Sequence, residues 1–185
     1  MSAQRVGALP ESDAEVAVVG RSNVGKSSLL NALGHRKDLA HTSKTPGRTQ
    51  LINLYELTSG GSFVDLPGYG YAAVPGNARA KWQQMIEGYL LGRESLMMVM
   101  IVVDGEIGPT KLDLQTLAWF RSHELPHVVV ATKHDKVKSS QRLRRKAELA
   151  AACMLQPDDV LWVSSSAGTG IDALRSMVRL WLSNP

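Results

Sequence analysis

The sequence predicts an α/β fold, with a six-stranded, mostly parallel sheet, one antiparallel hairpin strand, and helices on both faces. Short apolar runs of strand length alternate with longer segments of helical period, which is typical of parallel strands joined by helical crossovers. The chain has 185 residues and no internal repeat or linker, so it suits a single domain, 1–185, around one core.

Six segments are expected to be strands. Four of them are continuous apolar runs, as expected for strands buried on both faces. The other two flank Ser59-Gly60-Gly61 and predict an antiparallel hairpin. In chain order the six are Val16–Gly20, Gln50–Leu57, Ser62–Leu66, Leu96–Val103, His127–Thr132 and Val160–Ser164.

Five segments carry apolar residues at helical spacing and are expected to be helices. They are Lys26–Leu33, Ala78–Leu91, Leu112–Ser122, Gln141–Met154 and Ile171–Leu182. Ligands in this architecture bind beyond the carboxyl ends of the strands, and each motif described below falls at such an end.

The composition excludes disordered and membrane-spanning classes. Hydrophobic residues make up 44% of the chain and charged residues 21%, as in an ordinary globular protein. No apolar stretch approaches the ~20 residues that span a bilayer, and Met1–Ser12 lacks the apolar block of a signal peptide. The single cysteine, Cys153, fits a buried thiol in a reducing compartment. We therefore expect a cytoplasmic protein without a membrane partner.

A phosphate-binding loop is predicted between the first strand and the first helix. Gly20-Arg21-Ser22-Asn23-Val24-Gly25-Lys26-Ser27 matches G-x-x-x-x-G-K-S in the strand–loop–helix context that the motif requires. The glycines allow close backbone approach, and the loop amides with the helix N-terminus face the phosphates. Lys26 can reach the outer phosphates, the Ser27 hydroxyl can bind Mg²⁺, and Ser28 extends the predicted nucleotide-binding segment. The alternative is a glycine turn capped by Ser27.

A second motif predicts that the base is guanine. Thr132-Lys133-His134-Asp135 follows a buried strand, and the Asp135 carboxylate can accept hydrogen bonds from guanine N1–H and the exocyclic amino group. Adenine offers neither donor, so this contact discriminates by roughly 1–3 kcal/mol. The alkyl stem of Lys133 can lie along the base, and His134 is expected to be solvated. Val163-Ser164-Ser165 can add a backbone N–H to guanine O6.

Two polar segments predict sensors of the γ-phosphate, with a pair of ordinary surface turns as the alternative. In Asp65-Leu66-Pro67-Gly68, Asp65 can hold a Mg²⁺-bound water and the Gly68 N–H can meet the γ-phosphate. In His35–Gln50, Thr49 is the candidate second ligand of Mg²⁺. The candidate catalytic residues are Lys26, Thr49 and Gly68, and the further nucleotide contacts predicted here are Gly47, Arg48, Gln50 and Leu51.

With these motifs in place, the sequence resembles the EngB family of bacterial GTP-binding proteins over nearly its whole length. The resemblance rests on Gly20–Leu33, Thr42–Asn53, Val64–Ala72, Lys81-Trp82 and Ser164-Ser165. It implies a monomeric, Ras-like P-loop GTPase domain that binds GTP and GDP, with Mg²⁺ on Ser27 and Thr49. It also implies a role in assembling the large ribosomal subunit, linked to normal cell division and septation.

One segment, Val103–Thr110, departs from the pattern of the family. It is remote in sequence from the nucleotide motifs. We therefore expect the departure to affect contacts with a partner rather than GTP binding.

Hydrolysis is expected to be slow without a partner. Many GTPases orient the attacking water with a glutamine after the glycine, whereas this chain has Tyr69 there. In related GTPases an asparagine at the position of Asn23 helps to hold K⁺, which would stabilise developing charge. The alternative is that Asn23 only hydrogen-bonds the loop.

Two classes of function follow. The first is a GTPase switch, which is favoured by intact Lys26, Ser27, Thr49 and Asp65. The second is a nucleotide-stabilised RNA-binding assembly factor with negligible catalysis, which Tyr69 favours. A P-loop kinase is disfavoured by Thr132–Asp135.

A basic run near the guanine motif is either a solvated helix face or an rRNA-binding stripe. Its residues are Arg142, Arg144, Arg145 and Lys146, near Lys133, Lys136 and Lys138. The net charge of +4 permits a polyanionic partner without demonstrating one.

Overall fold

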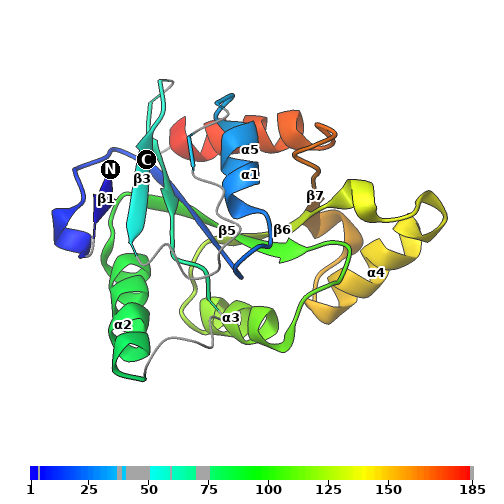
Figure 1. The fold of residues 1–185 in the computed structure, drawn as a ribbon, viewed down its shortest axis with the longest axis horizontal. Coiled ribbons are helices and arrows are strands. Elements are labelled where there is room, and N and C mark those ends of the chain that lie inside the picture. The colour runs from blue at the N-terminus through cyan, green and yellow to red at the C-terminus, as the bar shows by residue number, and fades with distance from the viewer. Residues whose placement is uncertain (4, 37–38, 41–50, 59, 70–75, 184–185) are drawn as a thin grey trace.

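The structure, a computed structural model, describes residues 1–3, 5–36, 39–40, 51–58, 60–69 and 76–183, with the backbone alone for 76–83 (Figure 1). The predicted site residues Gly47, Arg48, Thr49 and Gln50 lie outside these ranges.

In the described part of the chain, seven strands form one sheet in the order β1-β3-β4-β2-β5-β6-β7. The five strands from β4 to β7 in this order are parallel, β3 runs antiparallel to β4, and β1 runs antiparallel to β3. The bounds are β1 Ser2–Ala3, β2 Glu15–Gly20, β3 Ile52–Glu56, β4 Ser62–Asp65, β5 Leu96–Asp104, β6 His127–Thr132 and β7 Val160–Trp162. The predicted α/β class and its six strands are confirmed, and β1 is an addition to them.

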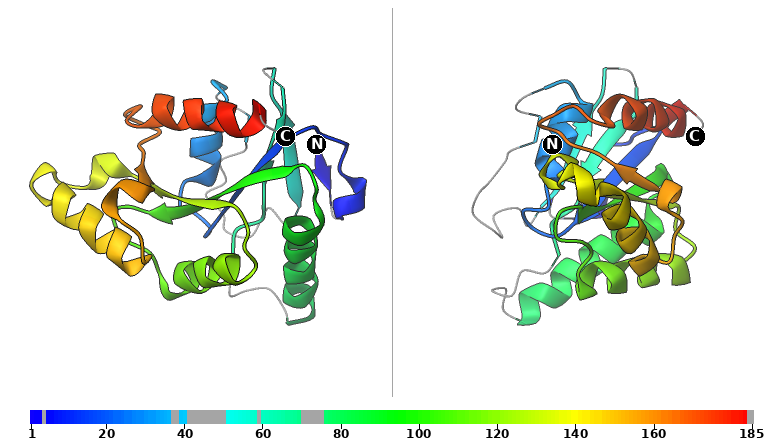
Figure 2. Two further views of the ribbon diagram at one scale, coloured as in Figure 1. Left: turned by 180° about the vertical axis from the view of Figure 1, so that it is seen from behind. Right: turned by 90° about the vertical axis from the view of Figure 1, so that its right-hand side faces the viewer.

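Among the residues that the structure describes, five α-helices cover the two faces of the sheet (Figures 1 and 2). They are α1 Lys26–Leu33, α2 Gly76–Gly92, α3 Lys111–Ser122, α4 Arg142–Ala152 and α5 Ile171–Ser183. Short 3₁₀ helices occur at Val6–Ala8, His134–Lys136, Ser139–Gln141 and Pro157–Asp159. In the described residues no helix is both long and apolar enough to cross a bilayer.

The core divides into two clusters because successive side chains of a strand point to opposite faces. Val16 and Val18 of β2 belong to the cluster under α1 and α5, whereas Ala17 and Val19 belong to the cluster under α2, α3 and α4. The same alternation runs through β5, so both faces of the central strands are buried. Cys153 lies in the second of these clusters with 2% of its surface exposed, as expected of a structural thiol.

The register brings the carboxyl ends of the central strands to one edge of the sheet. Gly20 of β2 is level with Val102 of β5, and Asp104 of β5 is level with Thr132 of β6. Asp65, the last residue of β4, is level with Val18. This edge therefore holds the residues of all the predicted nucleotide motifs that the structure describes.

Candidate functional site

The phosphate loop forms between β2 and α1 as predicted. A Cβ on Gly20 would lie 2.6 Å from the Val102 carbonyl oxygen, so only glycine fits where the loop leaves the sheet. Gly25 has φ +106°, a conformation that glycine adopts readily, and it is the N-cap of α1. Helix geometry leaves the amides of the first turn, Lys26–Ser28, without acceptors inside the helix. These amides are available to an anion.

Asp65 is a buried carboxylate with an unfilled bonding capacity. It is 6% exposed, and its Oδ1 has no hydrogen-bond partner among the described residues. Lys26 Nζ lies 3.9 Å from that oxygen, which is too long for a hydrogen bond. Burial raises the pKa of the Asp65 carboxyl, and Lys26 partly offsets this effect.

The oxygen donors of Asp65 and Ser27 are chemically suited to a hard divalent cation. An orphaned buried carboxylate oxygen calls for a cation or water, and oxygen donors such as Asp65 and the half-buried Ser27 are the ligands that Mg²⁺ prefers.

At the other end of the site, Ser164 holds the carboxylate that was predicted to read the base. Ser164 is fully buried, and its Oγ donates to Asp135 Oδ1 over 2.6 Å. The Ala167 amide in turn donates to Ser164 Oγ over 3.0 Å. Mainly because of the Ser164 hydrogen bond, the pKa of Asp135 is lowered, so this carboxyl stays ionised and can accept two hydrogen bonds.

The structure reduces the number of backbone amides in Val163-Ser164-Ser165 that could donate to guanine O6. The Val163 amide donates to the Ala131 carbonyl and the Ser164 amide to the Thr169 carbonyl, because both continue local backbone pairing. Of the three residues, Ser165 is therefore the one that could offer its amide, and it lines the cavity described below.

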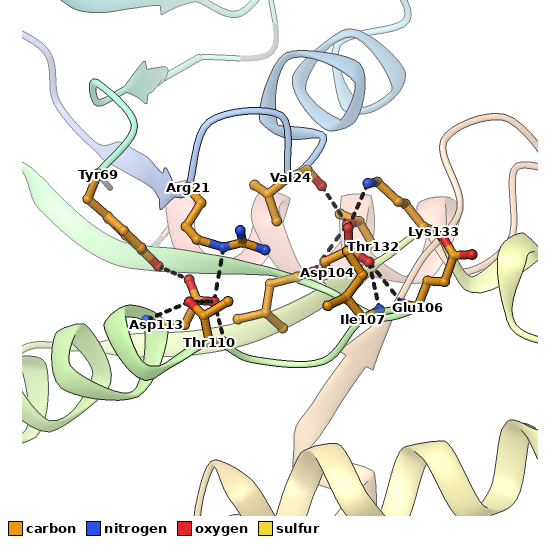
Figure 3. A network of polar contacts seen from close by, with 11 residues as sticks. Arg21, Val24, Tyr69, Asp104, Glu106, Ile107, Thr110, Asp113, Thr132 and Lys133 are labelled. Atoms are coloured by element: carbon orange, nitrogen blue, oxygen red, sulfur yellow. Dashed lines mark hydrogen bonds and ion pairs between the residues drawn. The ribbon is translucent and has the colours of Figure 1, made fainter. Parts of the chain in front are cut away.

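Thr132 and Lys133 connect the guanine motif to its neighbours (Figure 3). Thr132 Oγ1 lies 2.7 Å from the Val24 carbonyl oxygen and donates to it, which joins β6 to the phosphate loop. Lys133 Nζ lies 2.6 Å from Oδ2 of Asp104, a carboxylate that is 2% exposed. These contacts thus fix the position of the guanine motif relative to the phosphate loop.

The expectation that His134 is solvated holds only in part, because the residue is half-buried. Its Nε2 is buried without a hydrogen-bond partner among the described residues, and its ring packs edge-on to Trp162 at 5.7 Å between centroids. Burial lowers the pKa of His134, and the nearby Arg142 and Lys146 lower it further. The ring packs beneath the motif because the His134 amide donates to the Val163 carbonyl and fixes the backbone there.

A cavity of about 660 Å³ joins the two motifs. This volume lies in the usual range for a small-molecule site. Gly25 and Ser28 line the phosphate side, and Lys133, Asp135 and Ser165 line the guanine side. Another part of the cavity wall comes from α1 and the residues that follow it, and no sequence motif indicated it. Its residues are Asn31, Ala32, His35 and Arg36.

Two carboxylates at the site were also missed. Asp104 pairs with Lys133, and Asp113 contacts both Arg21 of the phosphate loop and Tyr69 after Gly68 (Figure 3). The segment Val103–Thr110 contains Asp104, and its last residue, Thr110, is bonded to Asp113, so the segment lies beside the nucleotide motifs. The expectation that its effects are confined to partner contacts rested on sequence distance alone. The available signals were a carboxylate at a strand end and a T-x-x-D capping pattern.

Comparison with known proteins agrees with this geometry. Residues 15–133 match the family model described as "50S ribosome-binding GTPase". The chain is 50% identical over 157 residues to "Probable GTP-binding protein EngB" of Desulforamulus reducens, covering 84% of this chain and 76% of that one. It is 46% identical over 170 residues to the protein of the same name in Thermotoga maritima, covering 91% and 87%.

Solved structures show the same fold. The crystal structure of a probable GTP-binding protein engB aligns with a TM-score of 0.73 at 21% identity, covering 93% of this chain and all of that one. The Era protein of Aquifex aeolicus bound to GDP.AlF4- aligns with a TM-score of 0.69 at 24% identity, covering 93% and 57%. With a family model over most of the chain and relatives near half identity, the chain belongs to the EngB family of GTP-binding GTPases.

Proposed function

We propose that this protein is a monomeric, single-domain GTPase switch that depends on Mg²⁺. The observation that carries the proposal is a cavity that reaches Gly25 of the phosphate loop at one side and the Asp135 carboxylate, held by Ser164, at the other. A guanine nucleotide would lie along it, with its base on Asp135 and its phosphates on the loop amides.

The proposed roles follow the chemistry of each group. Lys26 and the Gly68 amide would stabilise negative charge on the γ-phosphate, together with Thr49. Ser27 and Thr49 would bind Mg²⁺, with Asp65 acting through water, and the bound ion would neutralise phosphate charge. The buried, unpartnered Oδ1 of Asp65 supports this assignment.

We further propose that intrinsic hydrolysis is slow and that a partner raises it. Tyr69 holds the position where a water-orienting side chain is expected, and its hydroxyl is engaged by Asp113. The Nε of Arg21 is also paired with Asp113, at 3.3 Å from its Oδ2 (Figure 3). These two contacts equally favour the second candidate, a nucleotide-stabilised RNA-binding factor with negligible catalysis.

Potassium is proposed as an additional activator through Asn23, which is exposed with φ +63° at the tip of the loop. Turnover should then be faster in KCl than in NaCl, and Asn23→Ala should abolish the difference. Equal rates of the unchanged protein in both salts would leave Asn23 with a role in loop structure alone.

In the cell, we propose that the nucleotide state controls binding to large ribosomal subunit particles in the cytoplasm, through rRNA or ribosomal protein. Division and septation would then depend on the protein through ribosome assembly. The description of the family as ribosome-binding and the basic residues around α4 support this proposal.

Calorimetry with GTP, GDP and ATP tests the proposed function. GTP and GDP should bind in Mg²⁺ buffer, and ATP should not. Asp135→Asn should lose guanine and gain xanthine nucleotides, since the amide can donate to the 2-carbonyl of xanthine where guanine carries an amino group. Equal binding of GTP and ATP would refute guanine recognition, and phosphate release with and without ribosomal subunits separates the two candidate functions.

A further inference from the structure

Beyond the predicted motifs, the structure contains a polar network centred on Asp113, at the start of α3 (Figure 3). This carboxylate is 1% exposed and belongs to none of the nucleotide motifs. Its Oδ1 accepts from the Tyr69 hydroxyl over 2.8 Å, and its Oδ2 lies 3.3 Å from Arg21 Nε. Oδ2 also accepts from the amide and hydroxyl of Thr110, each over 2.7 Å.

The network fixes two segments that contact the proposed γ-phosphate position. Arg21 belongs to the phosphate loop, and Tyr69 follows Gly68 directly. Their backbones also form an isolated parallel bridge, which continues the pairing of β2 and β4 past the ends of both strands. The capping box at Thr110 and Asp113 anchors the carboxylate itself on α3.

In this arrangement the backbone of Gly68 lies close to the phosphate loop. A Cβ on Gly68 would lie 3.0 Å from the Ser22 amide nitrogen and 3.2 Å from both Ser22 Oγ and the Gly20 carbonyl oxygen. A γ-phosphate that bonds the loop and the Gly68 amide at once needs an N–H···O distance of about 2.9 Å on each side. In the GTP-bound state that we propose below, Gly68 would move away from Ser22 to make room for that group.

We propose that Tyr69 and Asp113 set the preference of the protein between GDP and GTP. This proposal rests on the proposed function, because it assumes that guanine nucleotides bind in the cavity. The Tyr69–Asp113 hydrogen bond stabilises the arrangement in which Gly68 contacts Ser22. GDP fits that arrangement unchanged, whereas GTP must break the Arg21–Tyr69 bridge and the hydrogen bond beside it.

The sign of the effect follows from linkage. A ligand shifts a two-state equilibrium only by its difference in affinity for the two states, and here the γ-phosphate supplies the difference. An interaction that exists only in the arrangement with Gly68 against Ser22 lowers the apparent affinity for GTP. It leaves the affinity for GDP unchanged. Removing the interaction raises the affinity for GTP alone.

Tyr69→Phe tests the proposal with the smallest change, since it removes one hydroxyl and keeps the ring. Hydrogen bonds to ionised groups are worth enough that the dissociation constant of a non-hydrolysable GTP analogue should fall about tenfold, while that of GDP stays the same. Asp113→Asn should act in the same direction. The effect of the double variant should be smaller than the sum of the two single effects, because both changes weaken the Tyr69–Asp113 hydrogen bond.

Tyr89→Phe is a matched control. Its hydroxyl donates over 2.7 Å to Glu15, another buried carboxylate, at the opposite edge of the sheet. It should reduce thermal stability as Tyr69→Phe does and leave the ratio of GDP to GTP affinities unchanged.

Titrations of all variants with GDP and with the GTP analogue separate the outcomes. Tight binding of both nucleotides with the same ratio in the unchanged protein and in Tyr69→Phe would overturn the proposal and leave the proposed function standing. A weaker affinity of Tyr69→Phe for the GTP analogue would also overturn it, because the hydroxyl would then support the GTP state. Failure of the unchanged protein to bind either nucleotide would overturn both proposals.

Discussion

The Ser164 hydroxyl orients the Asp135 carboxylate from beneath, over 2.6 Å, and is itself held by the Ala167 amide. Ser164 is fully buried, so it cannot contact the base directly and can only position the group that does. A carboxylate fixed by a buried donor needs no reorganisation when the ligand arrives, and preorganisation of this kind strengthens binding.

Ser164→Ala should therefore weaken GTP and GDP to the same degree, by about fivefold to tenfold, since both carry guanine. Calorimetric titration of each nucleotide measures the loss. Ser122→Ala is a suitable control because the exposed Ser122 hydroxyl caps the Trp119 carbonyl on α3, away from the base. Unchanged affinities in Ser164→Ala would show that Asp135 finds its orientation without the hydroxyl.

Among individual residues, the sequence indicated those that belong to a motif of fixed spacing. It missed those that only the fold brings to the site. Lys26 and Ser27 could be assigned because G-x-x-x-x-G-K-S fixes their positions relative to an anion. Asp113 could not, since a T-x-x-D pattern is an ordinary helix cap until β5 is placed beside β2. The partial burial of His134 was missed because neither its sequence neighbours nor its spacing indicated the edge-on contact with the Trp162 ring.

Among whole elements, the buried strands were the easiest to predict. β5 and β6 are continuous apolar runs. Such runs are expected of strands that are covered on both faces, because successive side chains are then all buried. β1 was missed because Ser2–Ala3 is too short for any period to show. What fixes it is tertiary pairing with β3, where the Leu54 amide donates to the Met1 carbonyl over 2.8 Å.

Helix α4 is amphipathic, and its basic residues give a prediction for the proposed ribosomal partner. Leu149 and Ala150 are buried, whereas Leu143 is 86% exposed among the arginines. Arg144 and Arg145 share one acidic neighbour, Glu148, so the helix keeps an excess of positive charge. Such a surface suits a phosphate backbone.

Replacing the four basic residues of this run with glutamine should weaken binding to large-subunit particles and flatten its salt dependence. The four are Arg142, Arg144, Arg145 and Lys146. The slope of log K against log salt should fall by about 0.7–0.9 for each phosphate that the helix no longer neutralises. Cosedimentation across a salt series measures this, with the scattered exposed residues Arg5, Lys111 and Arg179 changed to glutamine as the control. An unchanged slope would identify the run as a solvated face.

For the whole molecule, two buried carboxylates at opposite edges of the sheet, Asp65 and Glu15, differ in how fully they are hydrogen-bonded. At the carboxyl edge, Asp65 Oδ1 lacks a hydrogen-bond partner among the described residues, which is consistent with its proposed role in holding a Mg²⁺-bound water. At the other edge, Glu15 is fully buried and accepts from Arg93 Nη2 over 2.6 Å and from the Tyr89 hydroxyl over 2.7 Å. Arg93 also donates to the Pro10 carbonyl, which fixes the chain before β2. The fully paired Glu15 network can thus make the amino ends of the strands rigid.

Arg93→Met should lower the free energy of unfolding by about 3 kcal/mol, because it leaves the Glu15 carboxylate buried without its counter-charge. The double variant Glu15→Gln with Arg93→Met should recover part of that loss, since the uncompensated charge is gone. Arg175→Met is the matched control: Arg175 is also a partly buried arginine that donates to two carbonyls, of Leu33 and Ala32, but its acidic partner Asp172 is exposed. Its replacement should therefore lower the unfolding free energy by only about 1 kcal/mol. Urea unfolding of the four proteins measures these differences. A double variant no more stable than Arg93→Met alone would show that Arg93 acts through Pro10 and packing, and not by compensating the charge of Glu15.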